Sequence, residues 1–434
     1  MKIDINNETY TKLRDLNFAP QSDMSGSTVP VNEFSVDIVT TDTISAGMAA
    51  DLKSNDGTLW ASYWIIYAER AADSAEGSLV HIRAQSRLAL LDRVTMPAVM
   101  YNAASVATVM AAIFSPLGAS SYSLASSFTS ATVTGFCPEQ TARERLQWVC
   151  LVIGAYIKTF FTTKAAEILA LSSSETLILP NKTFWRPSVN YSDYVTAVKV
   201  KGYAYTSGAP ATMDKWVTDG TTTWIETEQE YQLLNPDVPE GVPTREVTVE
   251  GVGLIHSGNV SAILSRLALY YFKRMSADVT VINSGEYLPG DRVIVYTAED
   301  ALAVGYIESC NFRFGHRSAS QLKMTPVEVK ESATLTIQYK YGDKLLDTRT
   351  LTLPVGYIYC VDNPDMDLEE NDHRYVFLSL TPRVSGTMAA GGSTVVVNYQ
   401  LALDLDYVTR VLAIYAADAT TTTTEDGVTV VEIA

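Results

Sequence analysis

Alternation of apolar and polar side chains with a period of two is the feature that most limits the folds open to this chain. The pattern occurs in residues 34–38 and again in residues 80–84, and residues 59–67 form a run rich in aromatic side chains. Successive side chains of a β-strand point to opposite faces, so such a segment buries one face and exposes the other. Because residues 54–57 favour a tight turn, the sequence predicts a small antiparallel β-barrel over residues 1–95.

The next segment, residues 96–190, has a different pattern and is expected to form an α+β insert. Residues 103–114 carry apolar side chains at helical spacing. Thr141 and Glu144 form a capping box, in which two side chains satisfy free amides at the start of a helix. We expect this second helix to end at Gly154, because glycine tolerates the left-handed conformation. Its apolar face consists of Leu146, Val149, Cys150 and Ile153.

Residues 191–326 return to the strand pattern and predict a second small barrel. One helix is expected within this segment, over residues 260–274. Lys273 and Arg274 would then lie in its last turn, where the negative end of the helix dipole favours cations.

The last 108 residues, 327–434, are predicted to form an acidic C-terminal domain that begins near Pro326. They contain 7 basic and 16 acidic residues, a net charge of 7 − 16 = −9. Strand-like segments predominate and predict an antiparallel β-sandwich, although residues 405–415 are ambiguous and residues 420–424 fit a strand or a loop. The fold class is therefore mainly β: two small antiparallel barrels, an α+β insert and a C-terminal β-sandwich.

The charge of the chain limits its partners. Lys and Arg number 32 against 49 Asp and Glu, which gives a net charge of −17. A protein that grips the nucleic acid backbone needs clustered cations, and the densest basic site here is the pair Lys273 and Arg274. The acidity fits either a surface that DNA slides past without binding or a simple need for solubility.

Targeting signals are not apparent. Residues 1–4 lack an apolar signal core, and residues 96–114 are interrupted by polar residues and Pro97. We therefore expect no stable membrane insertion, and a soluble protein made in a reducing cytoplasm.

The residue types used in catalysis form no recognisable motif. Cys137, Cys150, Cys310 and Cys360 are far apart in apolar surroundings and are expected to be buried free thiols. His81, His256, His316 and His373 lack metal-binding spacing, and Ser257 is interpreted as a helix-start residue rather than a nucleophile. The sequence thus predicts no catalytic residue, no cofactor site and no metal site.

Two clusters leave alternatives open. Asp362, Asp365, Asp367, Glu369, Glu370 and Asp372 are interpreted as a solvated acidic loop, with a calcium site as the alternative. Five tryptophans are interpreted as barrel core or subunit interface, with a sugar-binding face as the alternative; they are Trp60, Trp64, Trp185, Trp216 and Trp224.

Three stretches together resemble the central hub proteins of phage tail tips. The first, residues 67–101, contains AQSRLALLDR after a strand hairpin. The second, residues 141–156, reads TARERLQWVCLVIGAY, and the third, residues 287–314, contains LPGDRV and GYIESCNFRF. The family includes the baseplate hub of contractile-tailed phages and the N-terminal part of siphophage tail-associated proteins. Residues 327–434 fall outside the resemblance.

The resemblance implies a structural role at the tail tip of a virion that is assembled in the host cytoplasm. Hubs of this family are trimers with two similar barrels per subunit, so the ring is pseudo-sixfold. Such a ring joins the sixfold tail tube, or a ring of distal tail protein, to a threefold spike or fibre. The tape measure protein is a further implied partner. DNA would pass through the bore without specific binding.

Two other functions stay open at this point. One is a fibre or adhesin whose aromatic side chains hold a cell-surface glycan, and the other is a cell-wall hydrolase without recognisable motifs. The three expected helices favour the hub over a fibre, because fibres are usually repetitive and wholly β. The sequence does not separate a contractile tail from a flexible tail or from a related injection machine.

Overall fold

The structure is a computed structural model that divides the chain into two compact units, Met1–Val329 and Lys330–Ala434. It describes residues 1–434 except 7, 75–76, 119, 179, 283–284, 299–300, 314–318, 362–365, 371–372, 382–383, 405–418, 426–427 and 434. The division lies close to the boundary expected near Pro326. The chain is mainly β with a helical insert, which confirms the predicted fold class.

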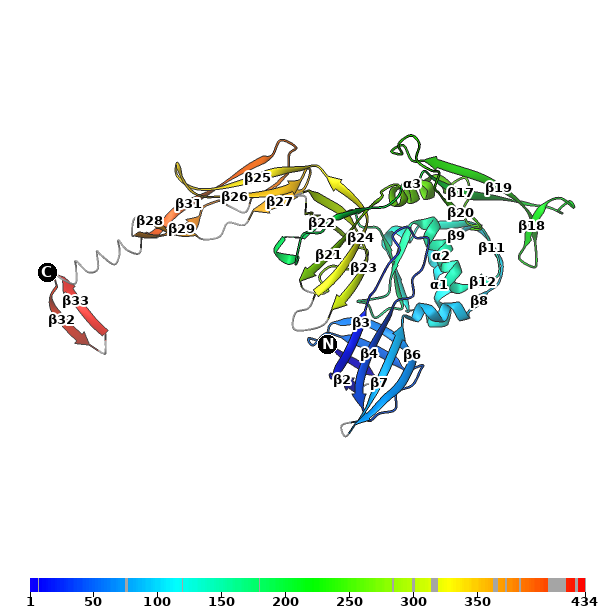
Figure 1. Cartoon of the computed structure of the whole chain (residues 1–434), viewed down its shortest axis with the longest axis horizontal. Helices are drawn as coiled ribbons and strands as arrows, with labels where there is room; N and C mark the ends of the chain where they lie inside the picture. Colours follow the sequence, from blue (N-terminus) through cyan, green and yellow to red (C-terminus); the bar gives the residue numbers. More distant parts are fainter. Residues whose placement is uncertain are drawn as a thin grey trace. The chain divides into compact units, whose positions relative to one another are not determined.

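A large curled sheet dominates the first unit, and in the described residues it has thirteen strands. Its first part, called here the N-terminal half-sheet (blue in Figure 1), comprises β1 (Lys2–Ile5), β2 (Glu8–Tyr10), β3 (Leu13–Phe18), β4 (Glu33–Thr40), β5 (Ala49–Lys53), β6 (Leu59–Ser74) and β7 (Gly77–Gln85). Its second half-sheet comprises β15 (Glu175–Ile178), β16 (Val189–Tyr191), β21 (Met275–Ile282), β22 (Arg292–Tyr296), β23 (Leu302–Arg313) and β24 (Ala319–Lys330). The hydrogen-bonded path runs β16-β21-β24-β23-β3-β4-β7-β6-β5-β1-β2, with β15 and β22 attached beside β23.

The predicted alternation decides which face of each strand is inside. Phe34, Val36 and Ile38 of β4 are buried, and Val80, Ile82 and Ala84 of β7 are buried opposite them. The turn at Gly57, with a positive φ of 94°, separates β5 from β6 as expected. These inward side chains form one continuous core with those of β21, β23 and β24.

An aromatic junction connects the two half-sheets. Among the described residues, β3 and β23 are joined by Phe18 opposite Phe312, with an isolated bridge between Gln21 and Ser309 beside it. The rings of Phe18 and Phe312 stack with centroids 5.6 Å apart, and the Trp60 ring lies edge-on to Phe312 at 4.7 Å. All three side chains are buried, so the junction is a packed part of the core.

The insert has a second core of its own. It contains α1 (Val106–Phe114), α2 (Ala142–Ile153) and the 3₁₀ turns η1 (Arg87–Arg93), η2 (Ser115–Leu117), η3 (Ser126–Phe128) and η4 (Pro180–Lys182). Its strands are β8 (Thr95–Met96), β9 (Val99–Ser105), β10 (Tyr122–Leu124), β11 (Thr132–Cys137), β12 (Gln140–Thr141), β13 (Ala155–Lys158) and β14 (Ala166–Ala170). Buried side chains of α1, α2 and β14 meet in this core.

The first predicted helix begins later than expected. Residues 103–105 belong to β9, where Ala104 pairs with Val133 of β11, and α1 starts only at Val106. Ala103 has a positive φ of 48°, which a right-handed helix cannot accommodate. Pairing with β11 therefore overrides the helical spacing at these three positions.

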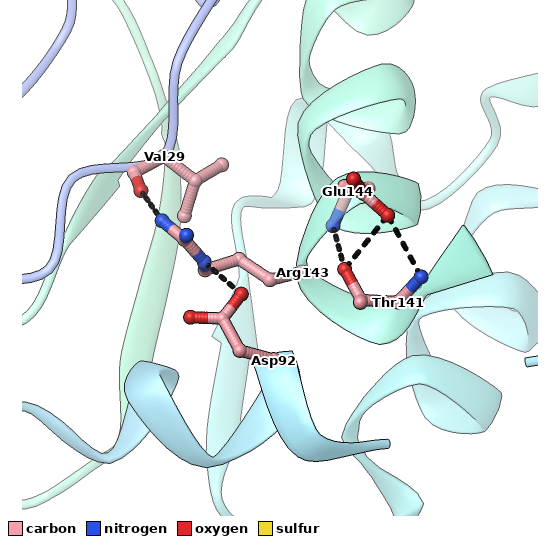
Figure 2. Close-up of polar contacts among 5 residues, drawn as sticks. All are labelled: Val29, Asp92, Thr141, Arg143 and Glu144. Atoms are coloured by element: carbon pink, nitrogen blue, oxygen red, sulfur yellow. Dashed lines mark hydrogen bonds and ion pairs between the residues drawn. The ribbon is translucent and has the colours of Figure 1, made fainter. Parts of the chain in front are cut away.

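Helix α2 agrees with its prediction at both ends. The Thr141 hydroxyl accepts a hydrogen bond from the Glu144 amide, and the Glu144 carboxylate accepts one from the Thr141 amide at 2.9 Å (Figure 2). Gly154 ends the helix in the left-handed conformation. Arg143 then fixes the helix to its neighbours, because it donates to Asp92 at 2.6 Å and to the Val29 carbonyl at 3.0 Å (Figure 2).

A separate four-stranded ribbon packs on the insert. It has the order β18-β19-β17-β20 and comprises β17 (Ala197–Ser207), β18 (Lys215–Thr218), β19 (Thr223–Leu234) and β20 (Glu246–Val249). Helix α3 (Val260–Tyr271) contacts β17, and Val198, Val200 and Ile263 lie in the core of the insert. Residues 191–326 therefore contribute to both cores of the unit, and the division into residues 1–95, 96–190, 191–326 and 327–434 stays a prediction.

Helix α3 is shorter than expected, so its predicted last turn is wrong. The helix stops at Tyr271, and Lys273 and Arg274 lie beyond it. The Arg274 guanidinium instead lies over the rings of Tyr194 at 4.2 Å and Tyr191 at 5.1 Å. The Arg274 cation was expected to interact with the negative end of the helix dipole. It interacts with the faces of these two aromatic rings instead.

The C-terminal unit is built from strands in the described residues. They are β25 (Ser332–Tyr341), β26 (Lys344–Pro354), β27 (Ile358–Val361), β28 (Met366–Glu370), β29 (His373–Ser379), β30 (Val384–Thr387), β31 (Ser393–Asp404), β32 (Ala419–Glu425) and β33 (Val428–Ile433). Five form the sheet β26-β25-β31-β29-β28, in which β25 and β31 run parallel. The sequence predicted a wholly antiparallel arrangement, and this prediction is wrong for β25 and β31. The chain leaves β25, passes through the strands from β26 to β30, and returns in the same direction in β31. The ambiguous residues 405–415 lie outside the described residues.

No helix in the described part of the chain is long and apolar enough to cross a membrane.

The cysteines differ in exposure. Cys137, Cys150 and Cys310 are buried free thiols as predicted, whereas Cys360 is exposed. Cys360 lies on β27, whose only partner strand in the described residues is β30, and its outer face is uncovered. Burial raises the pKa of the Cys137 and Cys150 thiols to about 12 and raises the pKa of Cys310 well above its ordinary value.

We predict that one thiol per native chain reacts rapidly with a thiol reagent at about pH 8, and that all four react in denaturant. The exposed Cys360 is open to the reagent, whereas burial shields the other three thiols and raises their pKa. Absorbance titration of the released chromophore counts the reactive groups. The Cys360→Ser variant should lose the rapid phase, and a rapid phase that survives in this variant would contradict the assignment.

We also predict that Phe312→Ala destabilises the first unit by about 3–5 kcal/mol, because it removes the ring on which Phe18 and Trp60 pack. Denaturation in urea, followed by tryptophan fluorescence, measures the loss. Phe184→Ala is the control, because Phe184 is 43% exposed and its loss should change stability by less than about 0.5 kcal/mol. Equal effects from the two substitutions would show that the junction is not a stabilising contact.

Candidate assembly surfaces

The residues considered for chemistry are distributed over the chain. His81 lies on β7 with its Nδ1 atom 2.6 Å from the Asp37 carboxylate, on the outward face of the N-terminal half-sheet. His256 lies before α3, and burial lowers its pKa. His316 lies outside the described residues, and nothing is described of the His373 side chain. Within the described residues, no group of three or more His, Cys, Asp or Glu side chains could hold a metal ion.

The start of α3 differs from the expectation for Ser257. The N-cap residue is Asn259, whose side-chain oxygen accepts a hydrogen bond from the His256 amide at 2.9 Å and whose amide donates to the Leu254 carbonyl at 2.9 Å. Ser257 lies two residues earlier and is not the cap. Asparagine is as good a cap as serine, so residue type alone could not select between the two positions.

The acidic cluster remains a prediction. Asp362, Asp365 and Asp372 lie outside the described residues, and for Asp367, Glu369 and Glu370 only the backbone of β28 is described.

The five tryptophans do not share one face. Trp60 is buried in the aromatic junction, and Trp64 lies under the guanidinium of Arg87 at 6.0 Å. The Trp224 ring lies 6.4 Å from that of Phe136. Trp185 and Trp216 are the two that are largely exposed; Trp185 precedes β16, and Trp216 lies on β18. The alternative of one sugar-binding face built from all five tryptophans is therefore wrong. The two exposed tryptophans are candidates for contacts at the surface.

One exposed tryptophan lies on a projecting hairpin, called here the arm and defined as residues 208–226. The arm contains β18 and the start of β19, and none of its residues is buried (Figure 1). Trp216 pairs across the hairpin with Ile225, and Met213 precedes it with 94% of its surface exposed. Such exposure of large apolar side chains on a short hairpin is typical of a contact surface.

The tip of the arm is held by its own polar groups. The Asp219 carboxylate accepts hydrogen bonds from the Thr221 hydroxyl at 2.7 Å and from the Thr221 and Thr222 amides at 2.9 Å, which lower the pKa of Asp219. Gly220 takes a positive φ of 90° at the turn. The arm is thus an ordered hairpin with a fixed negative charge at its tip.

A second surface feature is a cavity of about 280 Å³ beside α3, called here the α3 pocket. Its apolar lining comes from Met24, Leu171, Leu269, Val304, Pro326 and Val327, together with two tyrosine rings. Its charged lining consists of Arg266, Lys273, Arg292 and Glu328. Leu269 is 67% exposed although it lies on a helix that otherwise buries its leucines.

The cations of the pocket are held in place. Arg266 donates from Nη2 to the Leu151 carbonyl, and burial lowers its pKa only to about 10, so that it stays charged at neutral pH. Lys273 lies 3.4 Å from the Glu328 carboxylate, and Arg292 lies 3.5 Å from it. Arg292 also lies 3.2 Å from the Glu175 carboxylate, so the three cations of the lining and these two carboxylates leave a net charge of 3 − 2 = +1.

A third surface lies at the β16 end of the large sheet. Strand β16 is the last in the hydrogen-bonded order and pairs with β21 on one side. Phe184, Trp185 and Tyr191 are exposed near it. An exposed strand edge next to aromatic side chains is a common site for pairing with another chain.

Sequence reasoning missed both the arm and the pocket. Met213 and Trp216 stand between turn-forming residues in a stretch that carried no predicted element. Leu269 was visible as an apolar residue two positions after Leu267, off the predicted apolar face of the helix. The pocket itself could not be found, because its lining comes from distant segments that only the fold brings together.

Comparison with known proteins concerns the fold. No protein-family model matches the sequence, and a search of the curated proteins finds no match. The tail protein from Neisseria meningitidis MC58 matches 75% of this chain and 95% of its own length at 11% identity, with a TM-score of 0.52. The 43 kDa tail protein of prophage MuSo2 from Shewanella oneidensis matches 75% of this chain and 98% of its own length at 11% identity, with a TM-score of 0.53. This chain therefore has the fold of these two tail proteins, as its resemblance to tail-tip hub proteins predicted.

Proposed function

We propose that the chain is a structural hub subunit of a phage tail tip or baseplate. In this proposal three copies form a ring that joins a sixfold tail tube to a threefold spike or fibre and lets DNA pass. The observation that carries the proposal is the fold, shared with two tail proteins over nearly the whole length of each.

The two half-sheets support the symmetry of this proposal. One chain contains two curled half-sheets joined through the aromatic junction, and their described strand pairs are antiparallel except for the parallel pair of β15 and β22. Three chains would present six such parts around one axis. A ring of this kind meets a sixfold tube, or a ring of distal tail protein, on one side and a threefold spike or fibre on the other.

The charge supports a bore that DNA traverses without binding. Each chain carries a net charge of −17, so three chains carry 3 × (−17) = −51. Like charge repels the phosphate backbone, and the densest basic site along the sequence is only the pair Lys273 and Arg274. The tape measure protein would occupy the same bore before DNA enters it, at the tail tip of the assembled virion.

The role needs no chemical step. Assembly would draw its free energy from side chains buried between copies, and the exposed arm, the α3 pocket and the β16 edge offer apolar area for such contacts. This is why we assign the chain a structural rather than an enzymatic function.

We predict that the purified chain forms a trimer of 3 × 47.4 kDa, about 142 kDa, at micromolar concentration or above. Light scattering coupled to gel filtration measures the mass, and class averages in the electron microscope should show a threefold ring with a central opening. A stable two-fold dimer would contradict the proposal, as would a monomer up to the highest soluble concentration.

A further inference from the structure

The arm and the α3 pocket have matching apolar chemistry. The arm exposes Met213 at 94% and Trp216 at 54% of their surfaces. The pocket, at about 280 Å³, is large enough to receive one large side chain, and the exposed Leu269 extends its apolar rim. Burial of a tryptophan in a preformed apolar pocket is the type of contact that dominates protein interfaces.

The charges of the two surfaces are opposite. The arm carries Asp214, Asp219 and Glu226 against Lys215, a net charge of 1 − 3 = −2. Counted with Glu175, which pairs with Arg292, the pocket has a net charge of 3 − 2 = +1 in a chain whose overall charge is −17. A cationic pocket is therefore a local exception on this molecule, and an acidic hairpin is the kind of partner that it favours.

The arm of a chain does not reach the pocket of the same chain. Helix α3 contacts the ribbon, and the near part of β17 at Val198 and Val200 shares a core with it. The arm begins after Ser207 at the far end of β17, and Figure 1 shows β18 at the end of the ribbon away from α3. The five residue steps from Gly202 to Ser207 alone span about 17 Å of extended strand.

Contacts between two different surfaces of identical copies are heterologous. Each copy uses its arm on one neighbour and its pocket on the other, so the arrangement forms a ring when the rotation closes. This geometry is independent of which face of the ring meets the tail tube.

We propose that the arm of one copy docks in the α3 pocket of the next copy, with Trp216 as the inserted side chain. Met213 packs against Leu269 at the rim, and the arm carboxylates face Lys273 and Arg292. That the ring closes after three copies rests on the proposed function, whereas the contact between two neighbouring copies does not.

Cysteine cross-linking in the full-length chain tests the contact directly. In a Cys360→Ser background, Met213→Cys and Leu269→Cys are introduced singly and together, and mild oxidation is followed by non-reducing electrophoresis. Both positions are exposed, so the variants should fold. A mixture of the two single variants should give a covalent dimer, and the double variant should give covalent dimers and trimers.

Leu380→Cys is the matched control for Leu269→Cys, since Leu380 is 58% exposed but lies in the C-terminal unit. Paired with Met213→Cys, it should give no more cross-linked product than either single variant. Equal cross-linking of the control pair, or no product from the mixture of Met213→Cys and Leu269→Cys, overturns the proposal.

Self-association provides a second measurement. Trp216→Ala should raise the dissociation constant of the oligomer about tenfold or more in sedimentation. Leu380→Ala, which shortens a similarly exposed side chain outside the three surfaces, should change it less than about twofold. A trimer that persists unchanged in Trp216→Ala overturns the docking contact and leaves the hub function standing. Open chains of cross-linked copies longer than three support the contact and overturn the trimeric ring.

Discussion

The aromatic junction is the contact on which the arrangement of the first unit depends. Phe18 and Phe312 come from strands almost three hundred residues apart, and their stacked rings join the two half-sheets into one hydrogen-bonded path. The insert reaches the same point, because Phe161 follows β13 and lies 4.9 Å from Trp60, with its amide donating to the Trp60 carbonyl at 2.7 Å. Both cores of the unit are therefore connected through one buried cluster.

Polar contacts beside the junction reinforce this connection. The Ser22 hydroxyl donates to the Ile157 carbonyl at 2.9 Å, and the Asn32 amide donates to the Thr159 hydroxyl at 2.9 Å, both from the loop between β3 and β4. Buried polar groups with satisfied partners fix one geometry, because any displacement leaves a desolvated group unpaired. A subunit whose two curled parts must occupy neighbouring positions in a ring requires this kind of rigid internal connection.

The accuracy of the sequence predictions follows the range of the interactions behind them. The capping box at Thr141 and Glu144 and the left-handed Gly154 are correct at residue level, because their partners lie within four positions along the chain. The alternation in β4 and β7 correctly identifies the buried side chains. The predictions fail where a distant segment competes: β11 draws residues 103–105 into a strand, and the rings of Tyr191 and Tyr194 hold Arg274 beyond the end of α3.

The sequence by itself determined the mainly β class, the helix-rich insert, the acidity of the chain and the resemblance to tail-tip hubs, because each depends on local spacing or on composition. Only the tertiary structure decided that residues 191–326 supply strands to two different cores, that Cys360 is exposed, and that an acidic arm and a cationic pocket lie on separate parts of one unit. The physical reason is that burial and cavity shape are set by side chains far apart in sequence. Periodicity shows that a strand has an inner face, but it does not show which distant strand covers that face.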